Sequence, residues 1–171
     1  PNIYNPRFSY GGGKILTELM GIHYGKKYFK KLIIFRPHNV YGPNMGYEHV
    51  VPEFIRRFIK LKKNKKKFEI KGSGNETRSF IYIDDFITAF DLILKRGKHL
   101  NIYNIGTNEE IKISQLVLKL SKLFNKKIVL KKTKIDAGST KRRCPDITKI
   151  KKLGFKQKFK LNMGLKKTIG F

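Results

Sequence analysis

Tyr10 and Lys14 form the pair of side chains near the start of the chain that could carry acid–base chemistry. If both lie on a helix, a spacing of four places them one turn apart on the same face. An ammonium group at that position would favour the tyrosinate and lower the pKa of the phenol from ~10 toward neutrality, so that the phenolate could accept a hydroxyl proton. The spacing alone carries little weight, because abundant lysine predicts ~1.5 such pairs by chance.

Rarer segments follow this pair in a fixed order. The sequence RPHNVYGP (residues 36–43) leaves the end of an apolar run typical of a buried parallel strand, and ligands of open α/β sheets bind at such ends.

The charge balance is strongly positive. The chain has 39 Lys and Arg against 12 Asp and Glu, a formal net charge of +27, which by itself suggests a polyanionic partner. The excess is almost wholly lysine and accompanies abundant Ile, Asn, Phe and Tyr, all residues with A/T-rich codons, so base composition explains it without selection for binding. The dense block at residues 60–67 (KLKKNKKK) is expected to be a solvated loop, with a polyanion-binding patch as the alternative.

Few features point to metals, disulfides or membranes. The single cysteine, Cys144, cannot form a disulfide within the chain, and no Cys/His cluster has zinc-ligand spacing. The pair Asp84 and Asp85 is explained by a helix start, so no metal site is expected. Without a 20-residue apolar segment or a signal-peptide core, we expect a soluble, cytoplasmic protein.

Hydrophobic periodicity predicts alternating helices and strands, and therefore an α/β fold. Gly25 should stop the first helix, while Asp84 and Asp146 should cap two later ones. The strands at 31–36 and 101–105 are expected to be buried. Helices are predicted over residues 14–25, 49–61, 84–94, 114–124 and 146–152, and strands over 31–36, 68–72, 78–83, 101–105 and 127–130.

Five segments in this order resemble the extended short-chain dehydrogenase/reductase family, specifically its NAD-dependent sugar-nucleotide epimerases, dehydratases and decarboxylases. The segments are RPHNVYGP (36–43), TRSFIYIDD (77–85), YNIG (103–106), RRCPD (142–146) and LGF (153–155), downstream of Tyr10 and Lys14. The resemblance covers essentially the whole chain and corresponds to the second half of a family member.

The resemblance implies a fold in two parts. One is the C-terminal part of a Rossmann-like, doubly wound parallel sheet, formed by residues 1–43 and 98–125. The other is a small α/β substrate-binding domain, formed by residues 44–97 and 126–171. The Gly-rich NAD-binding half is absent from these residues, so strands 31–36 and 101–105 should have exposed apolar edges. Three glycines between Tyr10 and Lys14 should loosen that helix's first turn.

The resemblance also implies roles for individual residues. Tyr10 matches the catalytic tyrosine, and Lys14 the lysine that binds the nicotinamide ribose and lowers the pKa of the tyrosine. The cofactor would be NAD, with a nucleotide-diphosphate sugar as substrate and a homodimer as the full-length assembly. Residues matching the cofactor site are Tyr10, Lys14, Pro37, His38 and Val40. Residues matching the substrate site are Asn39, His49, Val50, Glu69, Lys71, Arg78, Arg143 and Asp146.

By the resemblance, Arg78 and Arg143 match arginines that bind the diphosphate. A planar, permanently charged guanidinium suits bidentate contact with a diphosphate, and these positions hold arginine in a chain that otherwise prefers lysine. The alternative is that both are ordinary exposed charges. Structural alternatives also exist for two other residues. His38 could be a packed loop histidine, and Asp146 a helix cap with no ligand. An Asn at position 39, between a buried strand and Tyr-Gly-Pro, has little packing reason to be there, which favours a binding role.

We therefore expect part of a UDP-sugar 4-epimerase-like enzyme, in which the tyrosinate accepts a sugar hydroxyl proton and a transient keto sugar forms. A dehydratase or decarboxylase of the same family is the alternative. A basic nucleic-acid-binding module is the alternative from another class, and it gives no role to Asn39 or to the two arginines.

Overall fold

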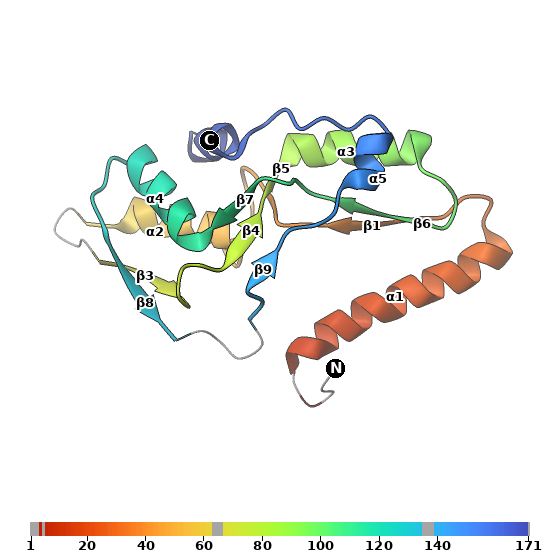
Figure 1. Ribbon diagram of the computed structural model, residues 1–171, viewed down its shortest axis with the longest axis horizontal. Helices are drawn as coiled ribbons and strands as arrows, with labels where there is room; N and C mark the ends of the chain where they lie inside the picture. The colour runs from red at the N-terminus through yellow and green to blue at the C-terminus, as the bar shows by residue number, and fades with distance from the viewer. Residues whose placement is uncertain (1–3, 5, 63–66, 135–138, 171) are drawn as a thin grey trace.

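A computed structural model of the chain describes residue 4 and residues 6–62, 67–134 and 139–170, and part of the lysine block at 60–67 lies outside them. The predicted α/β fold is confirmed (Figure 1). The helices are α1 (Pro6–Tyr28), α2 (Val50–Lys60), α3 (Ile83–Arg96), α4 (Ile113–Leu123), α5 (Thr148–Lys152) and α6 (Leu161–Ile169). The strands are β1 (Ile33–Pro37), β2 (Val40–Tyr41), β3 (Lys67–Lys71), β4 (Thr77–Ser79), β5 (Ile81–Tyr82), β6 (Asn101–Ile105), β7 (Glu110–Lys112), β8 (Val129–Thr133) and β9 (Arg142–Arg143).

Strands β1 and β6 form a parallel pair that runs from Ile33 beside Asn101 to Pro37 beside Ile105. Helix α3 lies along one side of this pair and α1 along the other (Figure 1). A core cluster joins α3 and β6 to α5, with Ile93, Tyr103 and Ile150 almost completely buried. The expectation that β1 is buried on both faces is wrong, because none of its residues is fully buried. Within the described residues its only partner strand is β6.

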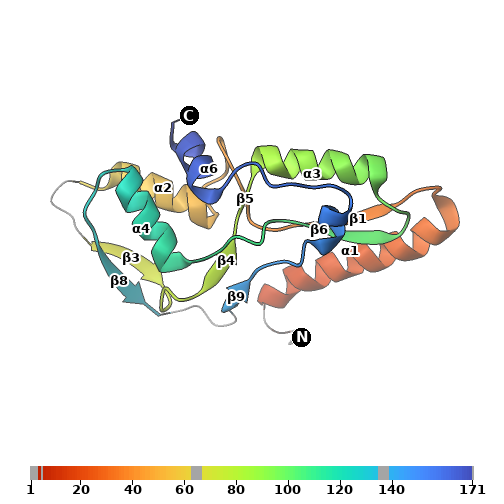
Figure 2. The ribbon, with the colours of Figure 1, turned by 45° about the horizontal axis from the view of Figure 1, so that its top comes forward.

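A second core gathers α2, α4 and α6 at the other end of the molecule (Figure 2). The ring of Phe58 on α2 stacks between Phe68 and Phe124, at centroid distances of 4.6 and 5.5 Å. The ammonium of Lys126 donates hydrogen bonds to the carbonyls of Phe58 and Leu61, at the C-terminal end of α2. Because four carbonyls at a helix end lack intrahelical partners, this lysine stabilises the end of α2.

The helices divide between the two cores. Helix α3 packs on β1 and β6, whereas helix α4 packs on α2 and α6. The division into residues 1–43 and 98–125 on one side and 44–97 and 126–171 on the other stays a prediction.

A three-stranded sheet lies between the two cores, with β4 in the middle. Strand β4 pairs antiparallel with β7 and parallel with β9. The predicted strand over 78–83 is therefore two short strands, since the chain leaves this sheet after Ser79 and pairs with β2 through Ile81 and Tyr82.

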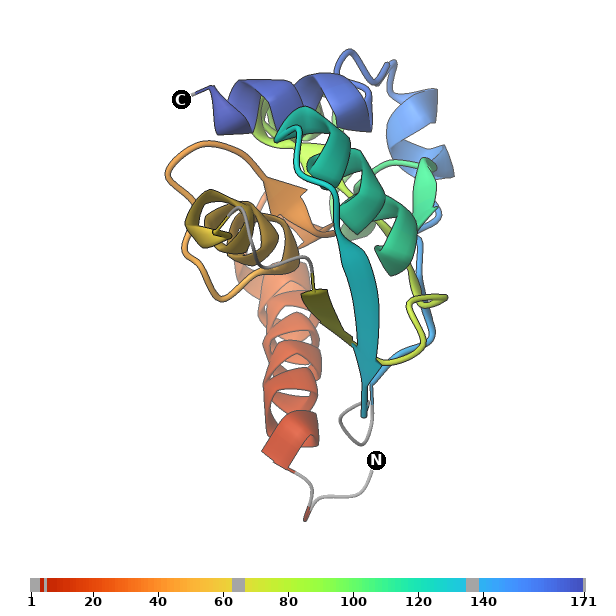
Figure 3. The ribbon, with the colours of Figure 1, turned by 90° about the vertical axis from the view of Figure 1, so that its left-hand side faces the viewer.

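Helix α1 is longer and more exposed than its sequence pattern predicts. It passes through Gly25 and ends at Tyr28, so the predicted stop is wrong. A Cβ at Gly25 would lie only 3.1 Å from the Leu32 side chain and 3.0 Å from that of Leu100, so close packing accounts for this glycine. Its apolar side chains are largely exposed, with Leu19 and Met20 about half exposed. Figure 3 shows α1 extending away from the other helices.

The start of α3 corrects the prediction for Asp84 and Asp85. The residue before the helix is Tyr82, so Asp84 is an exposed first-turn acid and not the N-cap. Asp85 is fully buried, and its carboxylate accepts hydrogen bonds from the backbone N–H groups of Lys158 (3.0 Å) and Phe159 (2.8 Å). Asp85 thus fixes the segment that leads into α6.

Replacing Asp85 with Ala should lower the free energy of unfolding by about 3 kcal/mol, because two backbone N–H groups lose a charged acceptor. Replacing the neighbouring Asp84 with Ala should cost less than about 1 kcal/mol, since only its interaction with the helix dipole is lost. Urea unfolding followed by circular dichroism measures both values. Equal effects of the two substitutions would show that the buried contact does not stabilise the fold.

Candidate functional site

Two arginines lie side by side where β4 and β9 run parallel. Arg78 is the register partner of Arg143 in this pair. Side chains of register partners project from the same face of a sheet, and like charges placed this way are destabilising. Both arginines line a cavity of about 340 Å³, within the range of small-molecule sites. An anion in the cavity would relieve the repulsion.

The chain just before β9 orients both guanidinium groups. Arg78 donates hydrogen bonds to the carbonyls of its neighbour Thr77 (2.7 Å) and of Thr140 (2.8 Å). Arg143 donates from Nε and Nη2 to the hydroxyl of Thr140, at 3.2 and 3.1 Å. Thr140 therefore contacts both arginines.

The N-terminal end of α2 forms another wall of the same cavity. His49 precedes the helix and makes no side-chain capping bond within the described residues, and Val50 and Val51 begin the first turn. Backbone N–H groups at a helix start lack intrahelical partners and carry partial positive charge, which favours an anion. Pro52, in the same turn, has no N–H and fits this position because none is needed there.

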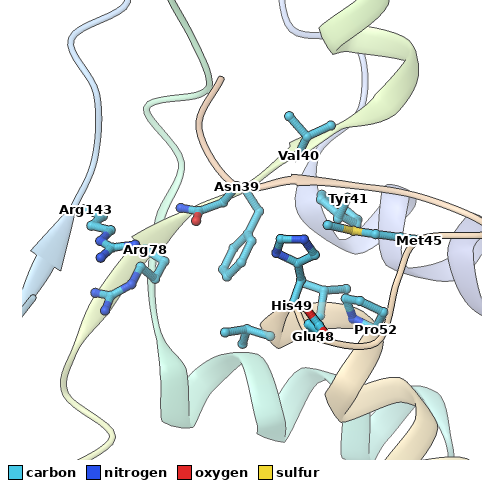
Figure 4. A pocket seen from close by; sticks show the side chains of 12 residues that line it. Asn39, Val40, Tyr41, Met45, Glu48, His49, Pro52, Arg78 and Arg143 are labelled. Atoms are coloured by element: carbon cyan, nitrogen blue, oxygen red, sulfur yellow. The ribbon is translucent and has the colours of Figure 1, made fainter. Parts of the chain in front are cut away.

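Asn39 lines the cavity from the loop after β1. Its amide points toward Arg78 and Arg143, whereas His49 lies at the centre of the view (Figure 4). Contrary to the sequence argument, Asn39 has a structural reason to be there. Its backbone adopts the left-handed conformation (φ 42°), which Asn tolerates better than most residues, and its Nδ2 donates to the carbonyl of Ser79 at 2.8 Å.

A neighbouring cavity of about 500 Å³ shares Val50 and Arg78 with the first, and contains the predicted residues Glu69 and Lys71 on β3. Glu69 is exposed and forms an ion pair with Lys131 at 2.7 Å, which lowers the pKa of its carboxyl. The two cavities together form an extended hollow beside Arg78.

Asp146 lies outside both cavity linings. Its Oδ1 accepts a hydrogen bond from the backbone N–H of Thr148 at 2.8 Å, and hydrogen bonding with the side chain and backbone of Thr148 lowers the pKa of the carboxyl. The residue immediately before α5 is Ile147, one position later than predicted, but Asp146 still satisfies a backbone donor at the helix start. The structure thus gives Asp146 the capping contact and does not bring it to the arginines.

Tyr10, Lys14, Pro37 and His38 line a different hollow, a groove of about 640 Å³ between α1 and β1. The ammonium of Lys14 lies 5.3 Å from the ring centroid of Tyr10, over the face of the ring. Val40, predicted beside these residues, lines the cavity of the two arginines instead. The loop after β1 therefore separates the two hollows.

An ion pair in this groove was not predicted from the sequence. Arg36 on β1 donates from Nε and Nη2 to the carboxylate of Glu18 on α1, at 2.7 and 2.5 Å, and these bonds lower the pKa of Glu18. The sequence does contain a signal for this contact. Glu18 follows Lys14 by four residues, as Lys14 follows Tyr10, so all three share one face of the helix. The pair connects α1 to β1.

The glycine-containing turn at residues 72–76 does not offer a phosphate site. The carboxylate of Glu76 accepts hydrogen bonds from the backbone N–H groups of Ser73 (3.0 Å) and Gly74 (2.8 Å). These are the donors that a phosphate would need. In the described part of the chain, no group of three or more His, Cys, Asp or Glu is arranged to hold a metal ion, and no helix is long and apolar enough to cross a membrane.

Comparison with known proteins identifies the family. Residues 1–106 match the NAD dependent epimerase/dehydratase family, so the chain belongs to it and the resemblance is confirmed. A dTDP-D-glucose 4,6-dehydratase of Dictyostelium discoideum is 41% identical over 110 residues, covering 64% of this chain and 24% of the relative. The dTDP-D-glucose 4,6-dehydratase of Mus musculus is 34% identical over 171 residues, covering 96% of this chain and 47% of the relative.

Solved structures of the family superpose closely. A UDP-glucose 4-epimerase of Thermotoga maritima, solved with UDP-glucose, has a TM-score of 0.86 at 28% identity, covering 94% of this chain and 52% of that one. A dTDP-glucose 4,6-dehydratase of Bacillus anthracis, solved with NAD, has a TM-score of 0.81 at 25% identity, covering 97% and 51%. The chain spans between about a quarter and a half of the length of the curated relatives it matches.

His38 provides a pH test of the loop between the two hollows. Burial lowers the pKa of its imidazole below the ordinary value of about 6.5. At pH values between the lowered pKa of the folded state and the ordinary pKa of the unfolded state, the unfolded chain binds more protons than the folded chain. The stability that neutral His38 supports above the unfolded pKa is therefore lost as pH falls through the folded pKa. Replacing His38 with Gln should therefore reduce the loss of unfolding free energy between about pH 7.5 and about pH 5.

NMR titration of the His38 ring should give a midpoint below that of a histidine in an unstructured peptide. A midpoint at or above the peptide value would contradict the burial argument.

Proposed function

We propose that this chain carries the nucleotide-sugar site of an NAD-dependent sugar-nucleotide 4,6-dehydratase. The observation that supports it most is the register pairing of Arg78 with Arg143 on the wall of a cavity that also contains the start of α2. Two guanidinium groups, each able to donate a pair of hydrogen bonds, and the free backbone N–H groups at a helix start form an arrangement suited to a diphosphate.

The choice of arginine strengthens the assignment of a diphosphate. In a chain with a formal net charge of +27, a loosely held anion would find lysines almost anywhere on the surface. Guanidinium groups held by backbone carbonyls and by Thr140 lose little conformational freedom on binding, whereas lysine ammonium groups are flexible point charges. The neighbouring cavity with Glu69 and Lys71 would then receive the nucleoside.

The relatives suggest two candidate reactions, 4,6-dehydration and 4-epimerisation. The sequence motifs alone favour an epimerase, but the curated relatives at 34–41% identity are named 4,6-dehydratases, which favours the alternative. The epimerase stays the second candidate because a 4-epimerase structure superposes with a TM-score of 0.86. Both reactions pass through a keto sugar, and the mass of the product separates them, since only a dehydratase releases water.

The groove between α1 and β1 suits the nicotinamide end of NAD. Its donors, the phenol of Tyr10 and the ammonium of Lys14, are groups that hydrogen-bond a ribose hydroxyl, and its wall is mostly apolar. NAD, when bound, accepts a hydride and returns it. Tyr10 would accept the sugar hydroxyl proton, with Lys14 favouring the phenolate. The described residues offer no glycine-rich turn at this groove for the dinucleotide's own phosphates, so we assign only this end.

Conservative replacement of Arg78 or Arg143 with Lys tests the diphosphate assignment. Each change keeps the charge but loses the fork of donors, so the affinity for thymidine diphosphate should fall about tenfold. Isothermal titration calorimetry on the chain measures it. The matched control is Arg96 replaced with Lys, because Arg96 donates to the carbonyl of Leu153 and lies outside both cavities. Unchanged affinity in both site variants, or an equal loss in the control, would refute the assignment.

A further inference from the structure

The three-stranded sheet carries an ion pair on the face opposite the two arginines. We infer that Glu110 and Arg142 position the diphosphate site by holding β9 in register, so that Arg143 stays beside Arg78. This inference rests on the proposed function, because it concerns how the proposed site is prepared. Neither residue lines the cavity, so both are positioning residues.

The contact runs across the middle strand of the sheet. Arg142 is the register partner of Thr77, one position before the pair of Arg143 and Arg78, so it projects from the other face. Its Nε donates to the carboxylate of Glu110 at 2.9 and 3.1 Å, and its Nη2 donates at 2.9 Å. The hydroxyl of Thr77 donates to the same carboxylate. Glu110 lies on β7, so one carboxylate connects β7, β4 and β9.

Strand β9 needs such support because it consists of two residues only. A slip of one position would exchange the faces, bringing Arg142 to the cavity and turning Arg143 away. A slip of β9 would also move Arg78, because Thr140 contacts both arginines. The carbonyl of Thr140 accepts a hydrogen bond from Arg78, and its hydroxyl accepts one from Arg143. The register of this short strand thus determines the geometry of both guanidinium groups.

Because Glu110 is negatively charged, the positioning role and simple electrostatics predict opposite changes in anion affinity when that charge is removed. The Arg142 guanidinium lowers the pKa of Glu110, which keeps this carboxylate ionised near neutral pH. Simple electrostatics predicts that removing a negative charge near an anion site tightens binding. A positioning role predicts weaker binding, because β9 loses the contact that holds its register.

The experiment replaces Glu110 with Gln and measures the affinity for thymidine diphosphate by calorimetry, at a temperature where circular dichroism shows the variant folded. We expect binding about fivefold weaker than in the unmodified chain. The matched control replaces Asp91 with Asn, which removes one negative charge and one ion pair, with Lys95, on a distant helix. This control should bind as tightly as the unmodified chain, or slightly more tightly. Exchanging the partners, with Glu110 replaced by Arg and Arg142 by Glu, should restore most of the affinity.

A second measurement needs no ligand. The backbone N–H of Thr77 donates to the carbonyl of Lys141 at 2.9 Å, where β9 joins β4. Its hydrogen exchange should accelerate in the Gln variant and not in the Asp91 control. Unchanged exchange, or binding as tight as in the unmodified chain, would overturn the inference. Faster exchange in a chain that does not bind thymidine diphosphate would instead refute the proposed function while leaving the positioning role intact.

Discussion

Two positive charges held side by side on one face of a sheet repel each other, and much of this structure serves to keep them there. Arg78 and Arg143 are neighbours across β4 and β9, and backbone carbonyls together with Thr140 direct their guanidinium groups. The start of α2 adds partial positive charge from a second direction. An arrangement of this kind raises the energy of the empty site, and the proposed diphosphate, with its two negative groups, would compensate for it.

The surrounding packing fixes the parts of this site in place. Helix α2 is held by the stacked rings around Phe58 and by Lys126 at its C-terminal end, so its N-terminal end stays at the cavity. The loop after β1 is fixed by the hydrogen bond from Asn39 to Ser79 on the adjoining segment. That loop has the proposed substrate cavity on one side and the groove of Tyr10 and Lys14 on the other. A sugar attached to the diphosphate would extend from the first hollow toward the second.

Much of this arrangement could be predicted from the sequence, because helices and buried strands leave periodic patterns. The strand that carries Arg78 and the helix that follows His49 were located within a few residues, whereas the two-residue strand β9, which carries Arg143, was not predicted. The failures involve contacts between distant segments, on which local patterns carry no information. Asp85 was interpreted as a helix-start acid, whereas it binds the backbone 73 residues away. Gly25 was interpreted as a helix stop, although close packing of Leu32 and Leu100 requires it. The capping contact of Asp146 is local, and it was predicted nearly correctly.

The account depends most directly on where a diphosphate binds. A crystal structure of the chain with thymidine diphosphate tests this. The account predicts phosphate oxygens about 3 Å from the guanidinium nitrogens of both Arg78 and Arg143, with the nucleoside extending toward Glu69 and Lys71. A diphosphate bound elsewhere on the lysine-rich surface, with both guanidinium groups unchanged and contacting solvent, would contradict it.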